Sequence, residues 1–522
     1  MSLRSSIRVF ISVSLLFAAG CGQVNETPDD TLVIGQVAEP RTLDPHVATS
    51  TNDFRILANI YEGLVRFADG SLEIEPALAK NWSVSDEATV YTFELREGVV
   101  FHDGSPFDAE AVRFNFERML DPEHPFRHTG PFPLAFFFEA VDRIETPDAH
   151  TVIFHLSEPF SPFLANLAYP TGYLVSPESV RSHDNAFGRN PSGTGPFRFV
   201  DWVSRRRVLL ERNPEYYGEA AAIEQLLFRP LSDENARLTE MLAGSVDLIM
   251  EVPPDIVQFF RSESEFQVIE RDGPHLWFCI LNTREGPFSD PRIRSAANLA
   301  VNRESITRDL LQGTASAAYS FFPDAFGIYE DEAFPESWRQ RDLDEARDLI
   351  AEAGQTGATI RFLVAESGSG MLEPRSMAEA IQADLSRVGL NVRIETFEWN
   401  TYLSIVNGGL EGHGDMAQMA WMTNDPDTLP YLTLRRAAWP EEGGFNSGYF
   451  ANDELDELLE AARRTADPSE RNRLYREADR ILHETRPWIP VASWRQNAVL
   501  SGAVEGLELQ PSFLLKLERA RK

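Results

Sequence analysis

Cysteine is scarce in this chain, which has two among its 522 residues, Cys21 and Cys279. Cys279 lies inside the apolar run 276–281, where a small and weakly polar side chain is typical of a core position. Cys21 ends an N-terminal segment of a different character, described below. Two cysteines in such different surroundings predict no internal disulfide.

Long hydrophobic runs are also missing beyond the first twenty residues. No later stretch of eighteen apolar residues occurs, although 43% of the chain is hydrophobic. There is no heptad array and no repeat with a period of about 20 to 50 residues. These absences argue against a helical membrane protein, a coiled coil and a solenoid. A chain of this length instead predicts two or three packed units.

The chain has fewer basic than acidic residues. Lys and Arg together number 48 against 81 for Asp and Glu, so the formal net charge is −33. A surface this acidic repels phosphate backbones and anionic lipid headgroups. We therefore expect no nucleic-acid partner, and we interpret the charge as a source of solubility.

Catalytic motifs are absent as well. The sequence contains no Gly-x-Ser-x-Gly elbow, no His-Glu-x-x-His pair, no phosphate-binding Gly-x-x-x-x-Gly-Lys and no Cys-x-x-Cys. His124 and His128 share helical spacing, but the prolines around them predict a loop, so no metal site and no cofactor are expected. The pattern favours a binding protein over an enzyme, with a secreted hydrolase as a distant alternative.

The first twenty residues have the composition of an export signal. Arg4 and Arg8 precede an apolar stretch, 9–19, that is too short to cross a bilayer as a helix. Residues 16–21, Leu-Phe-Ala-Ala-Gly-Cys, resemble the lipobox of bacterial lipoproteins, which implies that Cys21 becomes the lipidated first residue. We expect 1–20 to be the signal peptide and the polar residues 21–30 a flexible tether. The protein would then be exported and lipid-anchored at the cell membrane, facing the periplasm or the outer surface.

Strand and helix patterns alternate along the rest of the chain. Runs rich in Val, Ile, Leu and Phe predict strands at 31–35, 151–156, 208–211, 247–252 and 359–364. Apolar stripes at helical spacing predict helices at 344–353 and 376–388, each followed by a glycine, and further helices around 455–462 and 474–482. This mixture predicts an α/β protein.

One segment, 82–122, combines a strand, a turn and a helix in a distinctive order. Tyr91, Phe93 and Leu95 alternate with polar residues, a turn follows at 103–104, and Asp108 is placed to cap an amphipathic helix that ends before Pro122. The run resembles the signature of the peptide/nickel class of bacterial solute-binding proteins, family 5, the extracytoplasmic receptors of ATP-binding-cassette importers. Weaker marks of the same family occur at 193–197, 212–217, 288–294 and 300–303.

The resemblance implies a two-lobed periplasmic-binding-protein fold of class II, cluster C type, with an extra small domain. Lobe I would comprise 31–75, 185–283 and 484–522, the inserted domain 76–184, and lobe II 284–483. The two lobes would close on a small polar ligand, and the partner would be the permease of the importer. We expect a monomer that needs no cofactor.

The stretch 377–427 is most similar to dipeptide and oligopeptide receptors, which implies particular ligand contacts. Trp399 and Trp421 match cleft tryptophans, with core packing as the alternative for each, and Tyr402 is a further candidate. Where these relatives hold the peptide's ammonium with an aspartate, this chain has Asn424, followed by Asp425 and Asp427, either of which could take that role.

The position at which dipeptide receptors place an arginine is also changed. Gly368 stands there, beside Ser367, and these small groups could donate hydrogen bonds to a ligand instead, while Arg375 is a nearby cation. Because Asn424 and Gly368 differ from the residues of dipeptide receptors, the sequence leaves more than one class of cargo open. A peptide is favoured, and an oligosaccharide, nickel and haem remain possible ligands.

Overall fold

The structure is a computed structural model that describes residues 30–85, 88–329, 332–368, 370–371 and 373–522. The predicted signal peptide and Cys21 lie outside the described residues. Within them, no helix combines the length and the apolar character needed to cross a membrane.

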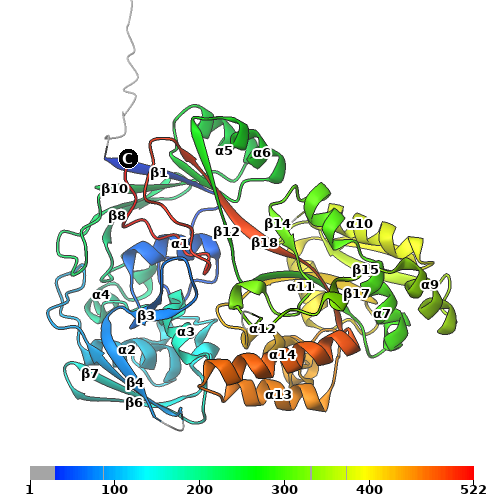
Figure 1. Ribbon diagram of the computed structural model, residues 1–522. Helices are drawn as coiled ribbons and strands as arrows, with labels where there is room; N and C mark the ends of the chain where they lie inside the picture. Colours follow the sequence, from blue (N-terminus) through cyan, green and yellow to red (C-terminus); the bar gives the residue numbers. More distant parts are fainter. Residues whose placement is uncertain (1–29, 86–87, 330–331, 369, 372) are drawn as a thin grey trace, which may run out of the picture.

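A 12-stranded sheet runs through the whole molecule (Figure 1). In spatial order its main path is β16 (Asn391–Phe397), β15 (Thr359–Ala365), β17 (Met416–Met422), β13 (His275–Leu281), β18 (Trp488–Ser501), β11 (Leu248–Met250), β1 (Thr31–Gln36), β10 (Gln225–Pro230), β9 (Arg207–Arg212) and β8 (Phe197–Val203). β12 (Phe266–Asp272) and β14 (Ala315–Ala317) pair with β18 beside this path.

A second, four-stranded sheet lies in the same half of the molecule as β1, β8 and β10, apart from the large sheet (Figure 1). It has the order β4 (Ala79–Val84), β5 (Val90–Leu95), β7 (Thr151–Leu156) and β6 (Val141–Asp148), and β2 (Val65–Phe67) and β3 (Ile74–Pro76) form a hairpin nearby. The helices are α1 (Thr51–Ile60), α2 (Ala109–Leu120), α3 (Phe163–Ala168), α4 (Pro177–His183), α5 (Glu234–Leu242), α6 (Pro254–Ser262), α7 (Pro291–Ala300), α8 (Arg303–Ser305), α9 (Leu343–Glu352), α10 (Pro374–Arg387), α11 (Trp399–Asn407), α12 (Thr428–Thr433), α13 (Asp453–Arg463) and α14 (Pro468–Thr485).

The predicted signature segment folds as expected. Tyr91, Phe93 and Leu95 point into the core from β5. The side chain of Asp108 accepts a hydrogen bond from the amide of Ala111 at 2.9 Å and caps α2. The α/β class is therefore confirmed.

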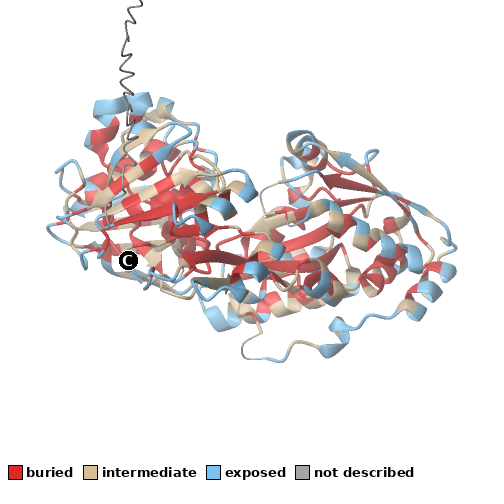
Figure 2. Cartoon of the chain, turned by 90° about the horizontal axis from the view of Figure 1, so that it is seen from above, coloured by how far each residue is buried: buried red, intermediate tan, exposed pale blue. Residues whose placement is uncertain are grey.

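The two ends of the large sheet belong to different hydrophobic cores. At one end, β1, β10, β11 and the four-stranded sheet share a core with α1 and α2, and we call this part lobe I. At the other end, α7, α9 and α10 cover one face of β13, β15 and β17, and α11, α13 and α14 cover the opposite face. We call this second part lobe II, and Figure 2 shows the two lobes joined by a narrower waist that buried strands cross.

The chain passes between the lobes where β12 gives way to β13, and again inside β18. Residues 495–501 of β18 pair with β12, whereas 488–492 pair with β13. These passages lie near Gly273 and Arg495, and β13 and the start of β18 pack into lobe II. At Gly273 a Cβ atom would overlap the ring of Phe513, so this passage requires a glycine.

The C-terminal segment after β18 returns to lobe I, where the buried side chain of Asn59 binds its backbone. Asn59 in α1 donates to the carbonyl of Leu515 at 2.8 Å and accepts from the amide of Leu517 at 3.0 Å. Asn59 is fully buried, so water cannot replace either bond.

Replacing Asn59 by Ala therefore tests how much these two hydrogen bonds contribute to stability. We expect Asn59→Ala to lower the free energy of unfolding by about 2 to 4 kcal/mol, because two buried backbone groups lose their partner. Chemical denaturation measures the change. Asn400→Ala, at an exposed position, is the control, and an effect no larger than that of the control would contradict the assigned role.

Candidate functional site

A pocket of about 460 Å³ lies between the lobes and is lined from both. Lobe I contributes residues from α1, from the loop before β6 and from the end of α3, and lobe II contributes the ends of β17, the start of α11 and the loop that leads into α12. The lining residues are Thr49, Thr51, Phe54, Pro133, Leu134, Phe136, Phe137, Tyr169, Gly370, Trp399, Leu403, Met419, Ala420, Trp421, Met422, Thr423, Asn424, Thr428, Leu432 and Phe445.

Trp399, one of the residues predicted to contact a ligand, forms part of this lining. It is the first residue of α11, which begins there because the carboxylate of Glu398 accepts hydrogen bonds from the amides of Asn400 and Thr401 at 3.0 and 3.2 Å. Its indole is half-buried, and a Cβ atom at Gly368 would lie 2.5 Å from it. Gly368 therefore makes room for the indole, and it is not itself part of the lining.

Tyr402 lies behind Trp399 and not in the lining. The two rings are stacked, with centroids 6.0 Å apart and planes 14° apart. Tyr402 is fully buried, and its hydroxyl donates to the carbonyl of Gln418. Tyr402 therefore supports the aromatic wall from the core.

Trp421, the second predicted cleft tryptophan, lies at the end of β17 and lines the pocket. Its ring meets the edge of Phe445 at 5.7 Å and 71°. Phe445 is 37% exposed and was not predicted from the sequence. The two rings form an aromatic corner on the lobe II side.

Asn424 lines the pocket and joins the two lobes. Its Nδ2 donates to Oδ1 of Asn166 in α3 at 2.9 Å, and both side chains are buried. Asn166 in turn donates to the carbonyl of Phe137 at 2.9 Å, so one chain of amides orders both rims of the pocket.

Asp425 and Asp427 are buried in ion pairs behind the pocket and do not line it. Asp425 binds the guanidinium of Arg471 in α14, with one contact at 2.9 Å, and Asp427 binds Arg463 in α13 at 2.8 Å. Burial raises the pKa of Asp427 to about 6, against the opposing effect of Arg463. Both carboxylates thus fix the loop after β17 to the helices beneath it.

The remaining sequence candidates also lie outside the lining. Ser367 is exposed. Arg375 is exposed and pairs with Glu379 at 3.0 Å within α10. The structure therefore brings Trp399, Trp421 and Asn424 together at the pocket and leaves Ser367, Gly368, Tyr402, Asp425 and Asp427 around it.

The lobe I side of the pocket was missed by the sequence analysis. Phe136 and Phe137 come from the aromatic run 132–138, and Phe54 and Tyr169 meet edge to face at 5.2 Å. The density of phenylalanine in 132–138 was the signal in the sequence that could have indicated this wall. In the structure Phe136 remains 38% exposed, as is typical of a surface that binds a ligand.

Lobe I and lobe II also touch directly beside the pocket. The amide of Ser161 donates to the carbonyl of Arg463 at 2.8 Å, and Arg464 pairs with Glu158 at 3.0 Å. The guanidinium of Arg463 lies 4.5 Å from the ring centre of Phe160. The C-terminal end of α13 is thus docked on lobe I.

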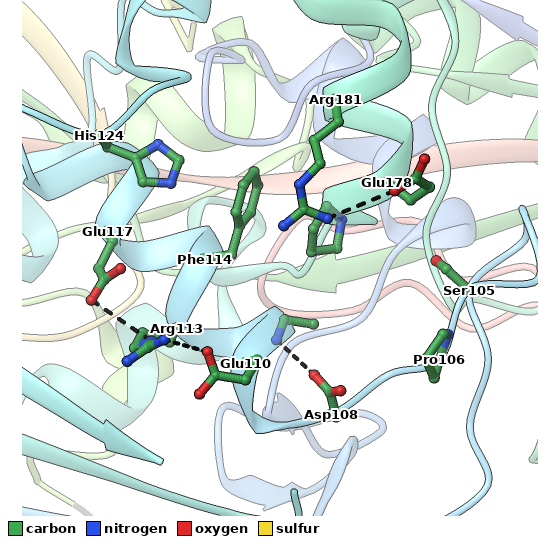
Figure 3. Close-up of a pocket in the computed structure, with 12 residues that line it drawn as sticks. Ser105, Pro106, Asp108, Glu110, Arg113, Phe114, Glu117, His124, Glu178 and Arg181 are labelled. Atoms are coloured by element: carbon green, nitrogen blue, oxygen red, sulfur yellow. Dashed lines mark hydrogen bonds and ion pairs between the residues drawn. The ribbon is translucent and has the colours of Figure 1, made fainter.

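A second hollow, of about 380 Å³, lies between α2 and α4 within lobe I (Figure 3). Its charged side chains are paired with one another: Arg113 contacts Glu110 and Glu117, and Arg181 lies 3.8 Å from Glu178. No residue of lobe II lines it, so a ligand there would not connect the lobes. The pocket between the lobes is therefore the candidate site.

No group of three or more His, Cys, Asp or Glu side chains is arranged to hold a metal ion in the part of the chain that the structure describes. His275 is nevertheless close to the site. Its Nε2 donates to the carbonyl of Gly370, which lines the pocket, at 3.0 Å, and its Nδ1 accepts from the amide of Trp494 in β18 at 2.9 Å. These two bonds require the neutral ring, and burial lowers the pKa of His275 to about 4.

This geometry predicts a pH dependence. An unfolded histidine binds its proton near pH 6.5, so the free energy of unfolding falls as the pH drops from 6.5 towards 4, by up to about 3 kcal/mol from this residue. We expect His275→Gln to flatten that decline relative to the unchanged protein, as measured by denaturation at several pH values. His413→Gln, at an exposed position, should keep the original slope. Equal slopes for all three proteins would rule out the role of His275.

The chain is similar to known proteins along most of its length. The family model described as bacterial extracellular solute-binding proteins, family 5 Middle, matches residues 73–440. The chain is 33% identical over 510 residues to di/tripeptide-binding protein 2 of Pseudomonas aeruginosa, with 94% of each chain covered. It is 31% identical over 473 residues to heme-binding protein A of Haemophilus influenzae, with 87% of this chain and 85% of that protein covered. A solved structure, the dipeptide binding protein of a Pseudoalteromonas species in complex with Met-Leu, has a TM-score of 0.79 at 27% identity and covers 94% of this chain and 100% of that one.

Proposed function

Because the chain belongs to the bacterial extracellular solute-binding proteins of family 5, we propose that it is the lipid-anchored receptor of an ATP-binding-cassette importer, which captures a small peptide between its lobes and delivers it to the permease. The family makes it an extracytoplasmic binding protein and not an enzyme, so the predictions of family, fold and absence of catalysis are confirmed. The cargo, the lipid anchor, the monomeric state and the boundaries of the lobes are the proposed parts.

The observation that carries the proposal is a pocket with walls from both lobes. A ligand that contacts Trp421 on one side and Phe137 on the other gains its full contact only when the lobes are together. Such a ligand stabilises the closed form over the open one by the free energy of the extra contacts. The closed shape is then the state that a permease would recognise.

Several features of the lining support a peptide as the cargo. Aromatic walls suit peptide side chains, because rigid rings provide large contact areas at little cost in entropy. Thr423, Asn424 and Thr428 add neutral hydroxyl and amide groups that can bond to a peptide backbone. The similarity to a di/tripeptide-binding protein and to a receptor solved with Met-Leu points the same way.

Haem is the second candidate. The lining combines flat aromatic rings with the thioethers of Met419 and Met422, and a methionine sulfur is one of the axial ligands that haem iron accepts. The similarity to heme-binding protein A favours the same class. No feature of the pocket favours nickel or an oligosaccharide to this extent.

A thermal-shift experiment with a tryptophan variant tests the site and the cargo together. We expect di- and tripeptides to raise the melting temperature, because a ligand of the folded state stabilises it. In Trp421→Ala the dissociation constant for the peptide should rise about 30-fold, or about 2 kcal/mol, since a partly buried indole typically contributes that much.

Trp202→Ala is the matched control, because Trp202 is also half-buried but lies outside the pocket, with its indole bonded to Glu39 at 2.9 Å. Its affinity for the peptide should equal that of the unchanged protein. A rise of the melting temperature with haem alone would contradict the peptide as cargo and support haem. Equal losses of affinity in both tryptophan variants would show that the ligand does not bind in this pocket.

The anchor is tested at Cys21. We expect Cys21→Ser to abolish incorporation of labelled palmitate and to move the protein from the membrane fraction to the soluble fraction, because a lipid chain is the only hydrophobic tether proposed. Cys279→Ser, at a fully buried position, is the control and should stay in the membrane fraction. Undiminished labelling of Cys21→Ser would contradict the predicted lipobox.

A further inference from the structure

The described lining of the pocket between the lobes is free of charge. None of its twenty residues is Asp, Glu, Lys, Arg or His. The whole chain is 25% charged, so a random set of twenty residues would include about five. The neutrality is therefore a property of this pocket and not of the composition.

Two carboxylates that adjoin lining residues along the chain, Asp425 and Asp427, are neutralised by the protein itself. Asp425 follows Asn424 and Asp427 precedes Thr428, yet neither lines the pocket, and they bind arginines of α14 and α13. Both guanidiniums and both carboxylates are mostly buried. Removing a carboxylate from such a pair to bind a ligand would leave a buried arginine without its partner, which is strongly unfavourable.

A charged group of a ligand that contacts this lining would exchange water for neutral side chains. A peptide with free ends carries an ammonium and a carboxylate, and burying either beside aromatic rings without a partner is costly. We propose that the pocket selects peptides whose ends carry no charge, such as N-acylated and C-amidated or cyclic peptides with aromatic or apolar side chains. This inference rests on the proposed peptide-binding function and narrows its substrate class.

The groups that remain in the lining match such a ligand. Phe136 and Phe137 on one lobe and Trp421 and Phe445 on the other offer aromatic surfaces to apolar side chains. The hydroxyl of Thr423 is buried and has no hydrogen-bond partner within the described chain. A neutral amide of the ligand is the kind of group that this hydroxyl can satisfy.

Calorimetry with three probes tests the inference: N-acetyl-Phe-Phe-amide, Phe-Phe with free ends, and N-acetyl-Ala-Ala-amide. We expect the capped Phe-Phe to bind at least tenfold more tightly than the free form, since only the free form brings two charges into the pocket. The capped Ala-Ala should bind more weakly than the capped Phe-Phe, because it lacks the rings.

Two variants of Asn424 test independently whether the absence of charge in the lining causes the preference for capped peptides. Asn424→Asp places a carboxylate in the lining and should reduce the preference for capped over free Phe-Phe by about tenfold. Asn424→Ala breaks the same bond to Asn166 without adding a charge, and it should keep the preference. If both variants change the preference equally, charge is not the cause and the inference fails.

The remaining outcomes separate this inference from the proposed function. If free Phe-Phe binds as tightly as the capped form or more tightly, the selection for uncharged ends is wrong, while the peptide receptor stands. If neither form binds and di- and tripeptides also leave the melting temperature unchanged, the peptide function itself is wrong and the inference falls with it.

Discussion

One strand holds two cores together. β18 spans 14 residues and pairs with β13 at its start and with β11 and β12 at its end, so its side chains are buried in both lobes. A strand can bend and twist, but it cannot shorten without losing its ladder of hydrogen bonds. The lobes can therefore change their angle about β18 but not their separation along it. The position of the pocket follows from this constraint, because α1 and the end of β17 are both placed by strands of the shared sheet.

The distribution of charge follows a second rule. The protein carries a formal charge of −33, but the site that faces its ligand is neutral. Two buried carboxylates beside it, Asp425 and Asp427, are each paired with an arginine, which reduces their contribution to the local field. The charge that favours solubility thus lies outside the lining of this pocket.

Much of the fold could be predicted from the sequence, because local patterns determined it. The cap at Asp108, the alternation around Phe93 and the glycine after α10, which adopts a φ of +94°, all appear as expected. The change of core inside β18 was harder to predict, because the polar residues Arg495, Gln496 and Asn497 mark it only once the pairing of the strand with β12 and β13 is known. Strand pairing, and not composition, decides that boundary.

The site was only partly predictable, for a physical reason. Trp399, Trp421 and Asn424 were found because a single stretch of sequence carries them. The roles of Asp425 and Tyr402 depend on partners far along the chain or in the backbone: Arg471 for the first and the carbonyl of Gln418 for the second. The lobe I wall is likewise brought to the pocket only by tertiary packing. Sequence alone cannot decide whether a carboxylate faces a ligand or an arginine 46 residues away.

The amide bond between Asn424 and Asn166 has a consequence for energy use by the importer. Together with the bond from Ser161 to Arg463, it joins the lobes through contacts that need no cargo. Each such bond contributes about 1 kcal/mol, which raises the share of empty receptors in the closed shape about fivefold. An importer that recognised the closed shape alone would then hydrolyse ATP on receptors that carry no cargo.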